Sequence, residues 1–343
     1  MARLMRAIWV TRHGDGRVLE VREAADPEPA PGEVRVRVAA AGLNFAEVMA
    51  RQGLYPDAPK PPCVVGYEGA GVIDALGAGV SAPAPGTRVL FLKRFGAHAS
   101  VVCVPASQVV AIPDAMSFDD AAAIPVAYLT AYHMLFNVAR LRAGDHVLIH
   151  MAAGGVGIAA LQLCRTVPGV VTYGTASAAK HEHLRREGCA HAIDYRTSDY
   201  VEEVRRLTGG RGVDVVLDAL GGPDWKKSYS LLGPAGLLVA FGVANANQSG
   251  RRNLLHVVSQ LARTPLFTPL GLMNVNRGVA GVNLGHLWGE TELLKAMLEA
   301  LVRLYAEGRI RPHIHARFSF AEAARAHAEL EQGKNVGKVV LVP

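Results

Sequence analysis

The stretch His146-Val-Leu-Ile-His-Met-Ala-Ala-Gly-Gly-Val-Gly-Ile-Ala-Ala-Leu-Gln-Leu-Cys164 decides the fold that this sequence predicts. An apolar run typical of a buried strand enters a cluster of small residues, and a run suited to a helix leaves it. In a dinucleotide-binding turn, one small residue allows the bend, a second lets the pyrophosphate approach, and a third lets helix and strand pack closely. Those positions are Ala152, Gly154 and Gly157 here, and Ala152 suits the first position if its φ stays negative.

Strands and helices alternate on the C-terminal side of this turn. The pattern predicts parallel βαβ units, and the apolar strands suggest a sheet covered by helices on both faces. The sequence therefore predicts an α/β fold with a doubly wound, Rossmann-type domain over 126–285. The predicted strands are His146–His150, Val170–Thr175, His191–Tyr195, Val213–Leu220, Leu237–Gly242 and Val279–Leu284, and the predicted helices include Ile158–Cys164, Ala178–Glu187 and Asp199–Leu207.

Short strands punctuated by Gly and Pro dominate the N-terminal part of the chain, which favours a β-barrel-like domain over 1–125. The tail, 286–343, has a long predicted helix, Glu292–Glu307, and a final strand, Lys338–Val342. A plausible topology returns this tail to the first domain. The predicted N-terminal strands are Met5–Val10, Glu33–Ala40, Gly69–Leu76, Arg88–Phe91 and Ser100–Val104.

Composition excludes several classes of protein. The 343 residues are 50% hydrophobic and carry a formal net charge of +6, which is modest for this length and argues against disorder. Helix-turn-helix, zinc-finger and aromatic-basic patterns for nucleic acid are absent from the sequence. The four cysteines have no C-x-x-C spacing, and neither a signal peptide nor a membrane-spanning run is visible. We expect a soluble cytoplasmic protein.

The end of the second predicted strand indicates which dinucleotide is bound. An NAD site usually has an acidic residue there to bind the ribose hydroxyls, but residues 173–177 contain none. Ser177, Lys180 and Tyr195 suit a 2′-phosphate instead, so we predict NADPH. The alternative is that Ser177 only caps the next helix and Lys180 is merely exposed. The predicted contacts of the turn and of the strand that follows it are Ala153, Gly154, Gly155, Val156 and Thr175.

Several motifs together resemble the zinc-free quinone oxidoreductase branch of the medium-chain dehydrogenase/reductase superfamily, and within it the vesicle amine transport protein group. The resemblance covers nearly the whole chain. It implies a GroES-like catalytic domain beside the Rossmann domain, and commonly a homodimer. The motifs are Ala41-Gly-Leu-Asn-Phe-Ala-Glu47, Arg51-Gln-Gly-Leu-Tyr-Pro56, Gly66-Tyr-Glu-Gly-Ala-Gly71, Ala123-Ile-Pro125, Thr130-Ala-Tyr132, Ala152-Ala-Gly-Gly-Val-Gly157 and Lys334-Asn-Val-Gly-Lys-Val-Val-Leu-Val-Pro343.

The resemblance also implies where a metal would be bound. Zinc alcohol dehydrogenases place a Cys and a His at positions that align here with Asn44 and Tyr67, and neither of these is a good zinc ligand. His98, His133, His146 and His150 are scattered and are interpreted as ordinary core or surface residues. We therefore predict an enzyme without a metal.

Two residues are candidates for the chemistry. Tyr55 is the first, because a matching Tyr donates a hydrogen bond or a proton in related enoyl reductases, and the alternative is an aromatic plug without a proton role. Asn44 is the second, as an amide that bonds the carboxamide, the ribose or the substrate oxygen. The resemblance further places Thr130, Gly242, Val243, Val282, Asn283 and Asn335 beside the cofactor.

These features predict an NADPH-dependent oxidoreductase that transfers hydride to small-molecule quinones or α,β-unsaturated carbonyl compounds. An enoyl-thioester reductase of lipid or polyketide synthesis and a low-turnover, membrane-associated NADPH-binding scaffold remain as alternatives. The apolar, basic segment 251–277 is open as well. A helix pair that covers the sheet and makes a dimer contact is favoured over a substrate cap or a membrane-surface contact.

Overall fold

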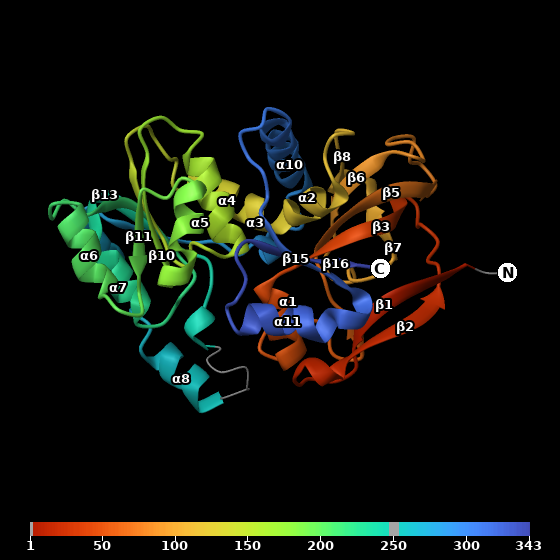
Figure 1. The fold of residues 1–343 in the computed structure, drawn as a ribbon, viewed down its shortest axis with the longest axis horizontal. Helices are drawn as coiled ribbons and strands as arrows, with labels where there is room; N and C mark the ends of the chain where they lie inside the picture. Colours follow the sequence, from red (N-terminus) through yellow and green to blue (C-terminus); the bar gives the residue numbers. More distant parts are fainter. Residues whose placement is uncertain (1–2, 247–253) are drawn as a thin grey trace. The chain divides into compact units, whose positions relative to one another are not determined.

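The computed structural model describes residues 3–246 and 254–343, and the chain divides into two compact units (Figure 1). The barrel unit contains residues 3–129 and 284–343, and the sheet unit contains residues 130–246 and 254–283. The chain therefore leaves the barrel unit, builds the sheet unit and then returns.

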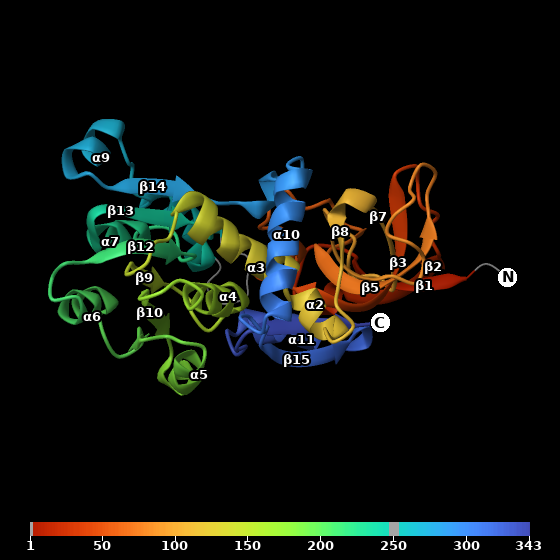
Figure 2. The ribbon, with the colours of Figure 1, turned by 90° about the horizontal axis from the view of Figure 1, so that it is seen from above.

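The sheet unit is built on six parallel strands in the order β11-β10-β9-β12-β13-β14. Figure 2 shows β14, β13, β12, β9 and β10 following one another across the unit. Helices α4 and α5 lie on one face of the sheet and α6 and α7 on the other, which confirms the predicted doubly wound fold (Figures 1 and 2). The strands are β9 (His146–Ile149), β10 (Val171–Ala176), β11 (His191–Asp194), β12 (Val213–Asp218), β13 (Leu232–Ala240) and β14 (Gly278–Gly281).

The helices of this unit show why the local sequence folds as it does. In α6 the Asp199 carboxylate caps the first turn by accepting from the Val201 N–H at 2.8 Å, and basic residues occupy the last turn. Its buried face, with Val204 at the centre, packs into a core under the sheet. The helices are α4 (Gly155–Cys164), α5 (His181–Arg186), α6 (Tyr200–Leu207), α7 (Asp224–Ser230), α8 (Leu254–Ala262) and α9 (Pro269–Val275).

The barrel unit combines a three-stranded sheet, β2-β1-β4, with a seven-stranded sheet in which β15, β16, β3, β5, β6 and β8 follow one another and β7 also pairs with β3. Alternate residues of β3, Val34, Val36 and Val38, point into the core. The strands are β1 (Leu4–Val10), β2 (Leu19–Ala25), β3 (Glu33–Leu43), β4 (Cys63–Val64), β5 (Glu68–Leu76), β6 (Arg88–Leu92), β7 (Val101–Pro105), β8 (Val109–Ala111), β15 (Ile314–Ser319) and β16 (Lys338–Val342).

The C-terminal tail completes this unit, because β16 pairs antiparallel with β3 and parallel with β15 (Figure 1). Helix α3 begins in the barrel unit and ends in the sheet unit, where a π-helical turn over His133–Val138 continues it. The remaining helices are α1 (Phe45–Gln52), α2 (Phe118–Ala123), α3 (Pro125–Tyr132), α10 (Thr291–Ala306) and α11 (Ala323–Glu331).

Some predicted elements differ from the observed ones. Strand β13 begins at Leu232, five residues before the predicted start, and crosses Gly233-Pro-Ala-Gly236 with Ala235 at a φ of 62°. The helix predicted from Ala178 opens with a 3₁₀ turn over Ala178–Lys180 before α5. The helix pair expected in 251–277 is present as α8 and α9, whereas 251–253 lies outside the described residues. Among the residues described, no helix is long and apolar enough to cross a membrane.

Candidate functional site

The turn between β9 and α4 has the tight geometry that its small residues predict. A Cβ on Gly157 would lie 2.5 Å from the Ala152 carbonyl oxygen, so only glycine lets α4 pack against the turn. The left-handed residue of the turn is Met151, with a φ of 52°, and Ala152 stays outside that region as the sequence requires. Helix α4 has Gly154 at its N-cap and no capping side chain. The amide N–H groups of its first turn are therefore available to an anion.

The residues predicted to bind the 2′-phosphate follow β10 and β11, which are adjacent parallel strands. Ser177 is the N-cap residue of the 3₁₀ turn, but its side chain makes no capping hydrogen bond. The alternative interpretation, that Ser177 only caps the next helix, requires such a bond. Burial, and then the nearby Arg196, lower the pKa of Lys180. Arg196 was not predicted, and its guanidinium lies 5.9 Å from the ring centre of Tyr195, which is 54% exposed. Lys180 and Arg196 repel each other electrostatically, and a bound anion would relieve this repulsion.

A buried hydrogen-bonded chain ties the carboxyl ends of three central strands together. The Ser228 hydroxyl donates to Asp218 Oδ2 at 2.6 Å, and His150 Nε2 lies 3.0 Å from Ser228 Oγ. On its other side, His150 Nδ1 lies 3.1 Å from Thr175 Oγ1, which also accepts from the Met151 N–H at 3.3 Å. Burial lowers the pKa of His150, so the ring is neutral and supports the turn rather than binding an ion.

The other positions predicted beside the cofactor divide between the units. Gly242 follows β13, where a Cβ would lie 3.0 Å from the Ala219 carbonyl oxygen. Val243 is 40% exposed, and Thr130 and Val282 are buried. Asn335 belongs to the barrel unit, and its Nδ2 donates to the Gly337 carbonyl oxygen at 2.9 Å. The structure thus places Ala153–Val156, Thr175, Ser177, Lys180, Tyr195, Gly242, Val243, Val282 and Asn283 in the sheet unit with Thr130, and Asn44, Tyr55 and Asn335 in the barrel unit.

Asn44 is held in a buried ionic network that the sequence analysis missed. Lys338 Nζ donates to Glu68 Oε1 at 2.5 Å and also to Asn44 Oδ1. Asn44 Nδ2 donates to Glu68 Oε1 at 2.8 Å and to Glu47 Oε1 at 3.2 Å. Because an ammonium group can only donate, it fixes which end of the Asn44 amide is the oxygen. Both Nδ2 hydrogens are then used inside the network, and Oδ1 faces the Lys338 ammonium and the first turn of α1.

The charges of this network balance. Glu47 and Glu68 are fully buried and Lys338 is 4% exposed. Burial raises the pKa of Glu47 to about 8, although the Lys338 ammonium opposes the shift. Glu47 is therefore mostly protonated at neutral pH, which leaves Glu68 and Lys338 as a single pair. Glu68 also accepts from the Val126 N–H at 2.6 Å, so the pair anchors the start of α3.

Tyr55 lies beside an aromatic cluster centred on Tyr67. The two tyrosine rings meet edge to face, with centres 6.5 Å apart. The Tyr67 hydroxyl is enclosed and has no hydrogen-bond partner of good geometry within residues 3–246 and 254–343. Burial raises the pKa of Tyr67, and Glu47 and Tyr55 raise it further, so the phenol stays protonated. The sequence motif Gly66-Tyr-Glu68 contains Tyr67 of this cluster and Glu68 of the ionic network. Most of their partners are distant in the sequence, so the motif alone did not predict either arrangement.

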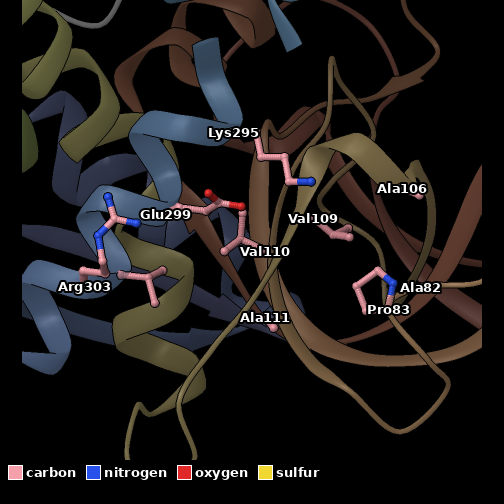
Figure 3. A pocket seen from close by; sticks show the side chains of 10 residues that line it. Ala82, Pro83, Ala106, Val109, Val110, Ala111, Lys295, Glu299 and Arg303 are labelled. Carbon is pink, nitrogen blue, oxygen red and sulfur yellow. The ribbon is translucent and has the colours of Figure 1, made fainter. Parts of the chain in front are cut away.

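A separate open hollow lies between α10 and β8 (Figure 3). Lys295, Glu299 and Arg303 follow one another along α10 and face the apolar residues 109–111. None of the predicted site residues lines this hollow, so we assign it no part in the site.

Comparisons with known proteins agree with this geometry. Residues 30–114 match the alcohol dehydrogenase GroES-like domain, and residues 188–341 match the zinc-binding dehydrogenase family. The human synaptic vesicle membrane protein VAT-1 homolog is 47% identical over 99% of this chain and 87% of its own length. A quinone oxidoreductase of Pseudomonas aeruginosa is 37% identical over 99% of this chain and all of its own length. The crystal structure of Escherichia coli quinone oxidoreductase complexed with NADPH superposes with a TM-score of 0.86 at 32% identity, over 98% of this chain and 100% of that one.

Proposed function

The chain belongs to the medium-chain dehydrogenase/reductase superfamily of oxidoreductases, and from this we propose that it is an NADPH-dependent, zinc-independent reductase of quinones or α,β-unsaturated carbonyl compounds. The observation that carries the proposal is the pairing of a tight glycine turn with a basic, acid-free end of β10 in one unit. The quinone oxidoreductases among its relatives support the same class of acceptor.

The residues present fit NADPH. The pyrophosphate would lie on the first-turn amides of α4, where the N-cap Gly154 has no side chain to compete with it. Ser177, Lys180 and Arg196 would hold the 2′-phosphate by charge-assisted hydrogen bonds. The His150 chain keeps the Met151 amide and Thr175 fixed relative to each other, so the turn is preorganised.

The protein's own contribution to the reaction is to place donors beside the substrate oxygen. A bound NADPH supplies the hydride, and negative charge then develops on that oxygen. The Tyr55 hydroxyl is the proposed donor to the oxygen, with Tyr67 behind it as a second phenol that stays protonated. Asn44, whose amide is held by Glu47, Glu68 and Lys338, is not free to donate to that oxygen and is proposed as a fixed polar group beside the cofactor ribose or carboxamide.

The same network supports the proposal of zinc independence. The resemblance aligns Asn44 and Tyr67 with the metal ligands of zinc alcohol dehydrogenases. Asn44 is already hydrogen-bonded to Lys338, Glu47 and Glu68. Tyr67 is a buried phenol that keeps its proton. An amide and a neutral phenol are poor zinc ligands. We therefore propose that hydrogen bonds polarise the substrate in place of a Lewis acid.

Tyr55→Phe tests the proposed chemistry. We expect wild type to oxidise NADPH when a quinone or an enone is supplied, equally with and without a chelator. The variant should lose on the order of 10²-fold in kcat because one donor to the developing charge is removed. Its NADPH affinity should be unchanged, since the lost hydroxyl is proposed to contact only the substrate. Steady-state kinetics with both acceptors and a cofactor titration measure these quantities.

Tyr305→Phe is the matched control, because its hydroxyl donates to Asp120 at 2.6 Å and is unconnected with Tyr55. Unchanged turnover of the Tyr55→Phe protein on both acceptors would return Tyr55 to the role of an aromatic plug. Binding of NADPH without oxidation by any acceptor would instead favour the scaffold alternative, and loss of activity with the chelator would contradict zinc independence.

The apolar helices α8 and α9 support a homodimer. Leu255 of α8, Leu266 between the two helices and Leu270 of α9 are 84%, 89% and 70% exposed, and β14, which follows α9 in the chain, is an edge strand of the sheet. Large exposed apolar surfaces and open sheet edges favour association. Light scattering should give twice the 36.4 kDa of one chain, and a Leu266→Glu, Leu270→Glu variant should be monomeric. A monomeric wild type that floats with anionic vesicles would favour a membrane-surface contact instead.

A further inference from the structure

The barrel unit contains an aromatic group of which the proposed chemistry uses only the tyrosine hydroxyls. Tyr67 is its centre, and its ring lies 6.2 Å from Trp288 at an interplanar angle of 18°, which is a stacked arrangement. Phe95 lies 4.9 Å from Tyr67 on a third segment of the chain. Three rings from segments far apart in the sequence therefore meet beside Tyr55.

The cluster is costly to maintain, which argues against simple space filling. Phe95 has a φ of 67°, a left-handed conformation that side chains other than glycine rarely adopt. Such backbone strain is often found at binding sites, where the surrounding structure maintains it. Trp288 is only half-buried, so one part of its ring system faces outward while Tyr67 supports the other.

A hydrogen bond connects the segment that contains Trp288 with the loop that contains Tyr55. His286 Nε2 lies 2.8 Å from Asp57 Oδ2, and Asp57 belongs to the loop that contains Tyr55. The segment with Trp288 is therefore attached to the loop with the proposed donor. Trp288 and Tyr55 both contact Tyr67, so a ring bound against Trp288 would belong to the same aromatic group as the proposed donor.

We propose that Trp288, supported by Tyr67 and Phe95, is a specificity-determining residue that selects planar ring acceptors over acyclic ones. The inference rests on the proposed function and adds the residue that discriminates between its two acceptor classes. A flat conjugated ring can stack on the indole of Trp288 over a large contact area. A small acyclic enone has no ring and gains less from this contact.

The test is the ratio of kcat/KM for 1,4-naphthoquinone to that for 3-buten-2-one, measured with the same NADPH. Because both acceptors share one enzyme and cofactor, losses of stability or cofactor affinity cancel in the ratio. We expect Trp288→Leu to lower the ratio about 3- to 10-fold, and Trp288→Phe, which keeps a ring, to lower it less than about 2-fold. Trp225→Leu, which removes a half-buried Trp of the sheet unit, should leave the ratio unchanged.

Equilibrium binding of 1,4-naphthoquinone without NADPH separates this inference from the proposed function. If no acceptor is turned over, the proposed function fails, yet a 3- to 10-fold weaker binding of the quinone by the Trp288→Leu protein would still support Trp288 as the ring-binding residue. An unchanged ratio together with unchanged quinone binding would overturn the inference. If Trp225→Leu lowered the ratio of the two kcat/KM values as much as Trp288→Leu does, the inference would be overturned as well.

Discussion

Replacing Lys338 with Met is expected to lower the free energy of unfolding by about 3–5 kcal/mol. The reason is that Glu68, which is fully buried, would lose the ammonium that lies 2.5 Å from its Oε1. Its remaining partners, the Asn44 amide and the Val126 N–H, are neutral donors and cannot balance a buried charge. Denaturant unfolding of the two proteins measures the difference.

Removing the charge from both partners gives a sharper comparison. In a Lys338→Met, Glu68→Gln protein no uncompensated charge is left, so most of the loss should be recovered. Lys227→Met is the matched control, because Lys227 pairs with Asp224 at 3.6 Å while 55% exposed, and such surface pairs contribute roughly 0–1 kcal/mol. A cost of the Lys338 change no larger than that of the control would mean that the ion pair does not hold the network together.

Lys180→Ala is expected to weaken NADPH binding about 10- to 100-fold, because one charge-assisted hydrogen bond to the 2′-phosphate is worth on the order of 1.5–3 kcal/mol. NADH has no such phosphate, so its affinity should hardly change. Titration of both cofactors against wild type and variant gives the two dissociation constants. Ser177→Asp should go further, since it repels the phosphate and offers an acceptor to the ribose hydroxyls of NADH.

Lys226→Ala makes the same change of charge at an exposed lysine on α7 and should leave both affinities within about 2-fold. Arg196→Ala should resemble Lys180→Ala if the two cations share one anion. A wild type that prefers NADH, or a Lys180→Ala protein that binds both cofactors equally less well, would show that the basic residues after β10 and β11 do not bind the 2′-phosphate.

Local patterns predicted most of the fold. The bounds of β16 agree with the predicted strand at both ends, and α10 is displaced by one residue, because each is an uninterrupted run with a clear period. Strand β13 was predicted five residues short because Gly233-Pro-Ala-Gly236 suggests a turn, whereas the strand continues through it with an irregular register. Helix α1 was missed although Asn44 and Glu47 at its start have capping-box spacing.

The sequence analysis proposed those parts of the candidate site whose residues lie close together in the sequence. The glycine turn and the end of β10 each lie within one βαβ unit, so their neighbours are set by local connections. Lys338 lies 270 residues from Glu68, and a charged side chain at the start of an apolar strand reads as exposed, so no local pattern predicts this pair. Trp288 and Phe95 were missed for the same reason, because only the tertiary fold brings them to Tyr67.

The return of the tail to the barrel unit has a consequence for biosynthesis. Strand β3 ends at Leu43, yet its partner β16 begins only at Lys338, so the ribosome makes the second strand long after the first. At about 5–20 residues per second, the 270 residues between Glu68 and Lys338 take roughly 13 to 54 s to synthesise. During that interval Glu68 has no lysine and the end of β3 lacks its partner β16, while the six strands of the sheet unit are made. The nascent chain therefore makes the strands of its second unit before it completes those of its first, and a truncation before Lys338 would leave Glu68 and β3 without their partners.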